Sequence, residues 1–165
     1  MRSWTTDTPV GPFTVLAEAD TVYASGWTTE LESLVAVMAP GLRPDSIDSS
    51  ADLGSISHAV RSYVDGDVHA IDDISVRQSS GPFISHAWDV LRAIPAGTTL
   101  TYGGFAAKCG RPSAARAAAG ACSRNAAALF VPCHRVISAK GLLHGFRYGL
   151  RPKGWLLDHE ARAAA

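Results

Sequence analysis

The chain of 165 residues is 47% hydrophobic, enough to bury a core as one domain or as two small ones. Charged residues make up 18%, a composition that argues against wholesale disorder. The sequence has no apolar run near the roughly 18 residues that would span a bilayer, and its N-terminus lacks the apolar core of a signal peptide. We therefore expect a soluble, cytoplasmic protein.

The net charge of zero conceals two oppositely charged halves. Residues 1–80 hold four Arg against twelve Asp or Glu, a balance of −8, whereas residues 81–165 have a balance of +8. A basic half beside an acidic one indicates that the C-terminal part meets a polyanion. The three cysteines lie in the basic half, and their odd number and spacing argue against a disulfide framework.

The N-terminal part predicts a small antiparallel sheet and two helices. Apolar residues alternate from Phe13 to Ala17, as in a half-buried strand, and Asp20 supplies a turn before the next run. The expected elements are paired strands within residues 1–27, a helix capped by Thr29 and ending near Met38, a loop over 44–54 and a helix over 57–64. We place a domain boundary near residues 79–81, so the expected domains are residues 1–80 and 81–165.

The C-terminal half predicts a mostly helical lobe with a helix-turn-helix. A helix over 82–94 has apolar residues at helical spacing, and two short helices follow, capped by Thr101 and Ser113. The second, over 114–123, consists almost wholly of alanine around the single Arg116. Such a smooth helix, from which one arginine projects, could approach a partner closely. An alanine-rich helix buried in the core explains the pattern equally well.

The chain then enters the motif Val131-Pro132-Cys133-His134-Arg135-Val136. We expect a short apolar strand before Cys133 and a paired strand over 135–137 after it. A loop over 138–149 precedes a closing helix over 150–161, which is expected to turn Trp155, Leu156 and Leu157 inward.

Cys133 beside His134 is compatible with several kinds of chemistry. Cysteine reacts as the thiolate, and a neighbouring imidazole can hold it in that form near neutral pH. Hydrolytic acyl transfer, metal binding and irreversible alkyl acceptance all use such a pair, and a buried structural cysteine is the plain alternative. A metal site needs three or four clustered ligands. The remaining histidines show no ligand spacing: His58, His69, His86, His144 and His159.

Several features accompany Cys133: Asn125, the run 132–135, Gly141 and Gly145, and a helix-like run ending in Glu160. This set resembles the O6-alkylguanine-DNA alkyltransferases (methylated-DNA–protein-cysteine methyltransferases), closely over about residues 83–160 and loosely through residues 3–5 and 10–13. The resemblance implies an α/β (α+β) fold. Its N-terminal lobe would be ribonuclease-H-like with an antiparallel sheet, and its mostly helical C-terminal lobe would be winged-helix-like.

The resemblance also implies suicide repair of O6-methylguanine, and of O4-methylthymine, without a cofactor. Cys133 would accept the alkyl group, His134 would act as base through a bridging water, and Asn125 would tie the recognition helix to the active-site loop. Glu160 would orient His134, with a structural ion pair at a helix end as the alternative role. Flipping the base out of the duplex is required because a buried thiol cannot otherwise reach O6.

The implied partner is double-stranded DNA with alkylated bases, bound through its minor groove by a monomer. Tyr102 would hydrogen-bond the flipped base, and Arg116 would fill the space that it leaves. The implied DNA and base contacts are Tyr102, Ser113, Arg116, Arg135, Val136, Phe146, Arg147 and Tyr148. Phosphate contacts from the basic half would make binding salt-sensitive. They are expected from Arg111, Arg124, Arg135 and Lys140.

The chain departs from the family pattern at three places. The usual Asn-Pro is Asn125-Ala126 in this chain, which is expected to loosen the loop. The usual Tyr-Gly-Glu is Tyr-Gly-Gly at residues 102–104. In the loop 145–149, Gly-Phe-Arg-Tyr-Gly, two large residues stand where small ones are usual. The alternative function is a non-catalytic alkyltransferase-like module that flips and flags lesions. Those proteins have tryptophan in place of the cysteine, so Cys133 favours the catalytic reading.

Overall fold

The computed structural model describes residues 1–141 and 145–164, and the chain divides into two compact units. Unit 1 is Met1–Ser79 with Ala126–Phe130, and unit 2 is Ser80–Asn125 with Val131–Ala165. The sequence had placed residues 126–130 in the C-terminal lobe. Among the described residues, no helix is both long and apolar enough to cross a membrane.

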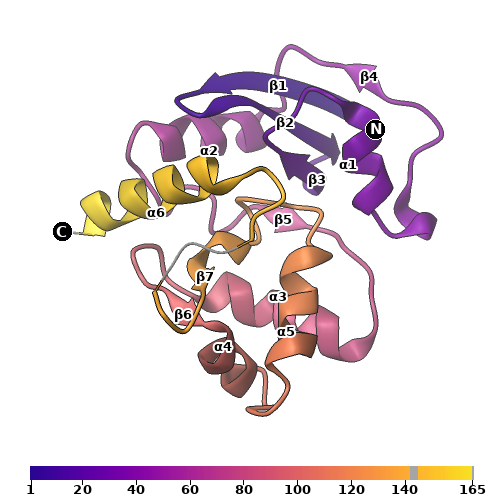
Figure 1. Cartoon of the computed structure of the whole chain (residues 1–165). Helices are drawn as coiled ribbons and strands as arrows, with labels where there is room; N and C mark the ends of the chain where they lie inside the picture. The colour runs from indigo at the N-terminus through magenta and orange to yellow at the C-terminus, as the bar shows by residue number, and fades with distance from the viewer. Residues whose placement is uncertain (142–144, 165) are drawn as a thin grey trace. The chain divides into compact units, whose positions relative to one another are not determined.

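Unit 1 is built on a five-stranded sheet in the order β4-β1-β2-β3-β5 (Figure 1). The strands are β1 (Arg2–Thr8), β2 (Gly11–Glu18), β3 (Thr21–Gly26), β4 (Asp48–Ser49) and β5 (Ser75–Val76). The first three form an antiparallel meander, as expected, and the two short edge strands run parallel to their neighbours. Phe13 and Val15 of the central strand are fully buried, so the alternating pattern marks the core of the unit.

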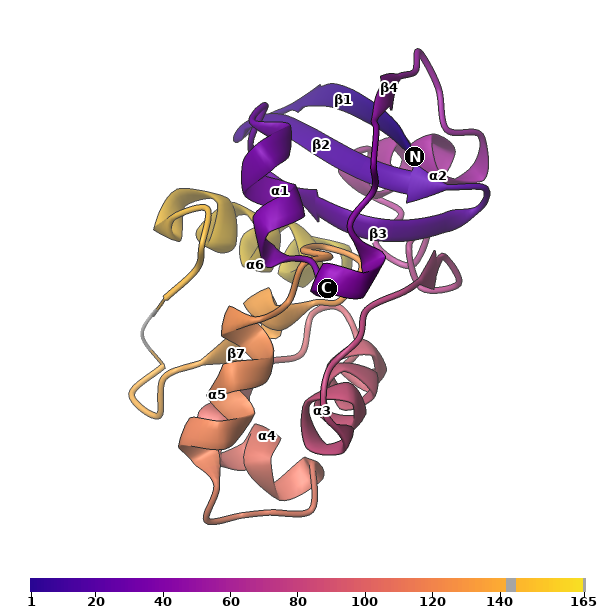
Figure 2. The same ribbon diagram turned by 90° about the vertical axis from the view of Figure 1, so that its right-hand side faces the viewer.

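Two helices cover opposite faces of this sheet, with α1 (Leu31–Val37) in front and α2 (Ser55–Val64) behind in Figure 2. A 3₁₀ turn, η1 (Pro40–Leu42), follows α1. The prediction that Thr29 caps the first helix is wrong. The Thr28 hydroxyl accepts a hydrogen bond from the Glu30 N–H (3.0 Å), so an extra turn delays the start of the helix.

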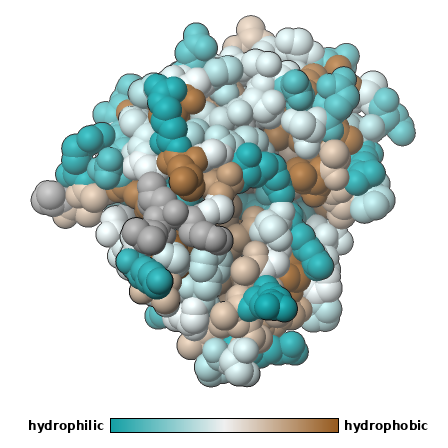
Figure 3. Space-filling view, in the orientation of Figure 1, coloured by the Kyte–Doolittle hydropathy of each residue, from teal (hydrophilic) through white to brown (hydrophobic). Residues whose placement is uncertain are grey.

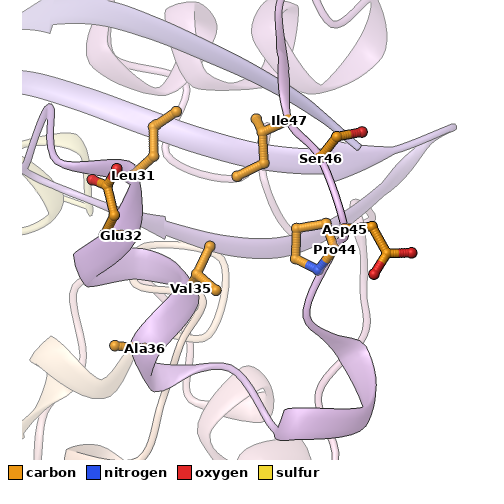
Figure 4. Close-up of a pocket in the computed structure, with 8 residues that line it drawn as sticks. All are labelled: Leu31, Glu32, Val35, Ala36, Pro44, Asp45, Ser46 and Ile47. Carbon is orange, nitrogen blue, oxygen red and sulfur yellow. The ribbon is translucent and has the colours of Figure 1, made fainter.

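A surface groove of about 440 Å³ lies in unit 1 between α1 and residues 44–47 (Figure 4). Leu31, Val35 and Ile47 supply apolar walls, and Glu32 and Asp45 are its charged residues. Its lining contains no thiol, imidazole or cation. We therefore assign it no part in the chemistry of Cys133.

Unit 2 has a helical core joined to a two-stranded parallel sheet. Its elements are α3 (Pro82–Ala93), β6 (Leu100–Thr101), α4 (Tyr102–Lys108), α5 (Ala115–Ser123), the 3₁₀ turn η2 (Cys133–Arg135), β7 (Val136–Ile137) and α6 (Leu150–Ala164). Helices α3, α4 and α5 pack together around Leu91, Phe105 and Ala118, all fully buried. The Trp88 indole donates to the carbonyl of Ala121 (2.9 Å), which fixes α5 against α3.

The helix-turn-helix forms as expected, with one difference in its caps. The Thr101 hydroxyl accepts from the Gly104 N–H (3.0 Å), so the predicted cap of α4 is confirmed. Ser113 does not cap α5, and this prediction is wrong. A turn between the Ala114 N–H and the Arg111 carbonyl (2.9 Å) carries the chain past Ser113 before the helix begins.

The segment leading to Cys133 is not the predicted strand. Ala127 forms only an isolated bridge with Ser25, and Leu129 has a φ of +79°, which interrupts extended backbone. Arg135 was predicted to open the paired strand, but residues 133–135 turn as a 3₁₀ helix and pairing starts only at Val136. In the closing helix Leu156 is buried as expected, whereas Trp155 and Leu157 are only half-buried.

Ala126–Phe130 is held within unit 1 by backbone and side-chain hydrogen bonds. The Ser25 N–H donates to the Ala126 carbonyl (2.8 Å), and its hydroxyl donates to the Ala128 carbonyl (2.7 Å). The Ala126 N–H donates to the side-chain oxygen of Gln78 (2.8 Å). Proline would lack that N–H. The alanine that was expected to loosen the loop therefore gains a hydrogen bond that the usual proline cannot make.

The anchoring role of Ser25 can be tested by removing its hydroxyl. Ser25→Ala leaves the buried carbonyl of Ala128 without that donor and should cost about 1–3 kcal/mol of the free energy of unfolding. Urea unfolding measures this loss, with the exposed Ser46→Ala as a matched control. Equal stability of the two variants would show that the bond contributes nothing.

Candidate active site

The pairing of β6 with β7 brings the predicted base-binding tyrosine to the reactive cysteine. Leu100 pairs with Val136 and Thr101 with Ile137 in parallel register. Tyr102 directly follows β6, and Cys133 opens the turn that directly precedes β7. Two residues 31 positions apart thus reach one site through a short backbone ladder.

Cys133 is buried, with 9% of its surface exposed. Burial raises the pKa of its thiol, and a hydrogen bond from the Asn125 side chain and the charges of Lys153 and Arg147 offset only part of this rise. The Asn125 amide also donates to the Val131 carbonyl (2.8 Å), which ties the end of α5 to the backbone just before the cysteine. The thiol is therefore held in its protonated form at neutral pH.

His134, Arg135 and Glu160 form a buried cluster at the reactive turn. His134 Nε2 lies 3.0 Å from Glu160 Oε2. Arg135 donates from Nε to Oε1 and from Nη2 to Oε2, both at 2.8 Å, and from Nη1 to the Ile94 carbonyl at 2.6 Å. All three side chains are at most 3% exposed. The carboxylate therefore has both a histidine and a guanidinium fork as partners.

The cluster sets the tautomer of His134. A carboxylate can only accept, so Nε2 carries a proton. Burial lowers the pKa of His134 more than the Glu160 carboxylate raises it, so the ring is neutral near pH 7 and its Nδ1 has a lone pair. That atom is buried and has no hydrogen-bond partner among the residues the structure describes. His134 is thus prepared to accept a proton at Nδ1.

The position of Arg135 corrects one expectation. It was assigned to DNA phosphate, but it is 2% exposed and its guanidinium bonds are made to Glu160 and Ile94. Burial raises the pKa of Glu160, but electrostatic attraction and hydrogen bonds from His134 and Arg135 outweigh it, so this pKa lies well below its ordinary range. Glu160 therefore contacts His134, as the expected orienting role requires, and also forms an ion pair with Arg135.

Lys153 is a site residue that the sequence analysis missed. It is 1% exposed, and its Nζ donates to the Val136 carbonyl (2.8 Å). Burial lowers its pKa, and its charge lowers the pKa of Cys133. Lys153 lies seven residues before Glu160, two turns along one helix, so it occupies the same face. That seven-residue spacing is the sequence feature that could have indicated a place for Lys153 near the site.

The two large residues of the loop 145–149, Arg147 and Tyr148, differ in how far they are buried. Arg147 is exposed, yet its guanidinium donates to the carbonyls of Asn125 (2.8 Å) and Ser123. Tyr148 is half-buried and packs edge-on against Phe146, with ring centroids 5.7 Å apart. Residues 142–144, including His144 of the expected loop, lie outside the described residues.

The predicted recognition helix presents a smooth surface with one cation. Arg116 and Ala117 of α5 are exposed, as is Ser113 before it, whereas Ala118 and Ala121 face the core. One face of the helix is therefore part of the core, and the other face is surface. In Figure 3 the region over α4 and α5 is pale to light brown with isolated hydrophilic residues. Val136 is buried, and it reaches the site through its backbone.

No group of three or more His, Cys, Asp or Glu able to hold a metal ion occurs in the part of the chain that the structure describes. Cys109, Cys122 and Cys133 are free thiols. Exposed cations of unit 2 include Lys108, Arg111, Arg116, Arg124 and Lys140. The Arg111 guanidinium also lies over the Phe83 ring, 4.7 Å from its centroid.

Comparisons with known proteins agree with this architecture. Residues 82–162 match the family model for the 6-O-methylguanine DNA methyltransferase, DNA binding domain. A methylated-DNA–protein-cysteine methyltransferase of Shigella flexneri is 35% identical over 156 residues, covering 93% of this chain and 91% of that protein. One from Mycobacterium bovis is 33% identical over 161 residues, covering 97% and 92%.

Solved structures show the same fold. The Mycobacterium tuberculosis O6-methylguanine methyltransferase matches with a TM-score of 0.81 and 27% identity, over 99% of this chain and 94% of that one. A crystal structure of OGT from the same organism in complex with DNA gives 0.80 and 25%, over the same shares. The fold and the Cys-His-Glu site therefore define a DNA alkyltransferase architecture. The chain belongs to the methylated-DNA–protein-cysteine methyltransferase family.

The buried carboxylate gives a prediction for the stability of the Glu160→Gln variant. The variant leaves the Arg135 guanidinium buried without a counter-charge and should lose about 3–5 kcal/mol of the free energy of unfolding. Urea unfolding at pH 7 measures this, with the exposed Asp158→Asn on the same helix as control.

The pH dependence of that loss is a further check. The pKa of Glu160 is lowered on folding, so its stabilisation is complete above its ordinary pKa of 4.5 and declines as the pH falls below it. The difference between wild type and Glu160→Gln should therefore shrink in acid. A constant difference down to pH 3 would contradict this linkage.

Proposed function

We propose that this protein repairs O6-methylguanine, and O4-methylthymine, in DNA by moving the methyl group irreversibly to its own Cys133. The observation that carries the proposal is the buried Cys133-His134-Glu160 arrangement, with His134 Nδ1 available to accept a proton. The 35% identity to a methylated-DNA–protein-cysteine methyltransferase over most of the chain supports the same reaction. The protein would react once, because the thioether formed is stable.

In the proposed reaction the Cys133 thiol loses its proton to His134 through a water, and Glu160 stabilises the imidazolium. The sulfur then attacks the methyl carbon in line with the carbon–O6 bond. A carbon–sulfur bond forms, the carbon–oxygen bond breaks, and guanine leaves with the electron pair and takes up a proton. The pKa of Tyr102 is raised, chiefly by burial, so its hydroxyl stays protonated and can donate to the flipped base.

DNA is the partner, and we infer that a monomer engages its minor groove with α5. The smooth exposed face of α5 permits close approach, and Arg116 projects from it to take the place of the extruded base. Arg111, Arg124 and Lys140 are exposed cations suited to phosphate contact, whereas Arg135 is buried. Affinity would then fall steeply with added salt.

Intact-protein and peptide mass measurement tests the acceptor directly. After incubation with duplex DNA that contains O6-methylguanine, we expect one added methyl group on the peptide that contains Cys133. Cys133→Ser should abolish transfer while DNA binding persists. Methyl on Cys109 or Cys122 would overturn the assignment, and binding without any transfer would favour the non-catalytic alternative.

Arg116→Ala tests base extrusion separately from the chemistry. Loss of the inserted side chain should slow transfer from duplex DNA by about tenfold or more, since unstacking a base costs a few kcal/mol that this residue would offset. Transfer from the free base O6-methylguanine should change little, because no extrusion is needed. Arg162→Ala removes an exposed cation remote in sequence and serves as the control. Equal slowing on both substrates would contradict the role.

A further inference from the structure

Arg147 connects the loop 145–149 to the C-terminal end of α5. Its Nη1 donates to the Asn125 carbonyl (2.8 Å) and its Nη2 to the Ser123 carbonyl. The last carbonyls of a helix have no partner within the helix, and a cation there is stabilised by the helix dipole. A planar guanidinium can reach two acceptors at once, here the Ser123 carbonyl at the end of α5 and the Asn125 carbonyl two residues beyond it, which an ammonium point charge does less well.

The loop fixed in this way lies by the segment that leads to Cys133, because Asn125, whose carbonyl accepts from Arg147, donates from its side chain to the Val131 carbonyl (2.8 Å). Burial raises the pKa of Tyr148, the charge and a hydrogen bond of Arg147 lower it, and the charge of Cys133 raises it. The ring of Tyr148 also packs edge-on against the ring of Phe146, with an interplanar angle of 72°. Tyr148 is therefore held by Arg147, its chain neighbour, and by the Phe146 ring.

We propose that Arg147 is a positioning residue that latches the loop to α5 and thereby holds Tyr148 where it limits the size of the alkyl group that can reach Cys133. This inference rests on the proposed function, transfer of an alkyl group to Cys133. It assigns Arg147 to main-chain carbonyls, in place of the DNA or base contact implied by the resemblance. Size selection then depends on a contact outside the space that the alkyl group occupies.

The latch itself is tested by limited proteolysis with chymotrypsin, which cleaves after aromatic residues. Arg147→Ala should speed cleavage after Phe146 or Tyr148 by about fivefold or more, because local opening becomes easier. Arg147→Lys keeps the charge without the fork and should behave like the alanine variant. Arg162→Ala is the charge-matched control and should cleave at the wild-type rate. Wild-type cleavage rates in both Arg147 variants would overturn the latch.

The effect on specificity is tested by comparing transfer of benzyl and methyl groups from O6 of guanine in duplex DNA. Arg147→Ala and Arg147→Lys should each raise the benzyl-to-methyl rate ratio by about fivefold or more, since release of an overpacked contact has that scale. Tyr148→Gly should raise the ratio as well. In the Tyr148→Gly background, Arg147→Ala should change it less than about twofold, because Arg147 acts through Tyr148.

A phosphate-contact role gives a different pattern. In that case Arg147→Ala would weaken DNA binding and reduce its salt dependence, Arg147→Lys would restore both, and the ratio would stay at its wild-type value. That result overturns the proposal. Absence of any transfer by the wild type overturns the proposed function and size selection together, whereas the cleavage rates still decide whether Arg147 holds the loop.

Discussion

The buried carboxylate of Glu160 is the interaction on which the reactive turn depends. Removing a carboxylate and a guanidinium from water is costly, and the cost is offset here by the two-point pairing with Arg135 and the bond to His134. The same carboxylate thus fixes the 3₁₀ turn that contains Cys133 and holds the His134 ring with Nδ1 unbonded. Because Glu160 lies on α6, the position of that helix also sets the orientation of the His134 ring.

The electrostatics keep Cys133 and His134 neutral in the resting protein. Burial raises the pKa of Cys133 and lowers that of His134, so the resting pair is a thiol and an imidazole rather than an ion pair. A buried thiol is a poor target for oxidants, which suits a cysteine that is used once. The positive charges of Lys153 and Arg147 oppose the rise in the thiol pKa, so they reduce the cost of forming the thiolate.

Much of the fold could be predicted from local sequence patterns. The sequence could not show which residues far apart in the chain form hydrogen bonds with each other. The meander of unit 1, helix α3 and the Thr101 cap follow from periodicity and capping within a few residues. Arg135 was assigned to phosphate because arginine is usually exposed, and its partner Glu160 lies 25 residues away. The Ser25 bond to Ala128 spans 103 residues, so no local pattern indicated it.

Two departures from the family pattern are explained by partners that the chain itself supplies. Ala126 has the N–H that proline lacks, and Gln78 accepts from it, so the backbone before Cys133 is held by a hydrogen bond in place of a ring. Arg147 is larger than the usual residue, and the end of α5 provides two carbonyls for its guanidinium. A substitution near the site is therefore best interpreted together with the group that meets it. Ala126 adds a hydrogen bond to the segment before the cysteine, whereas Arg147 adds a constraint on the loop 145–149.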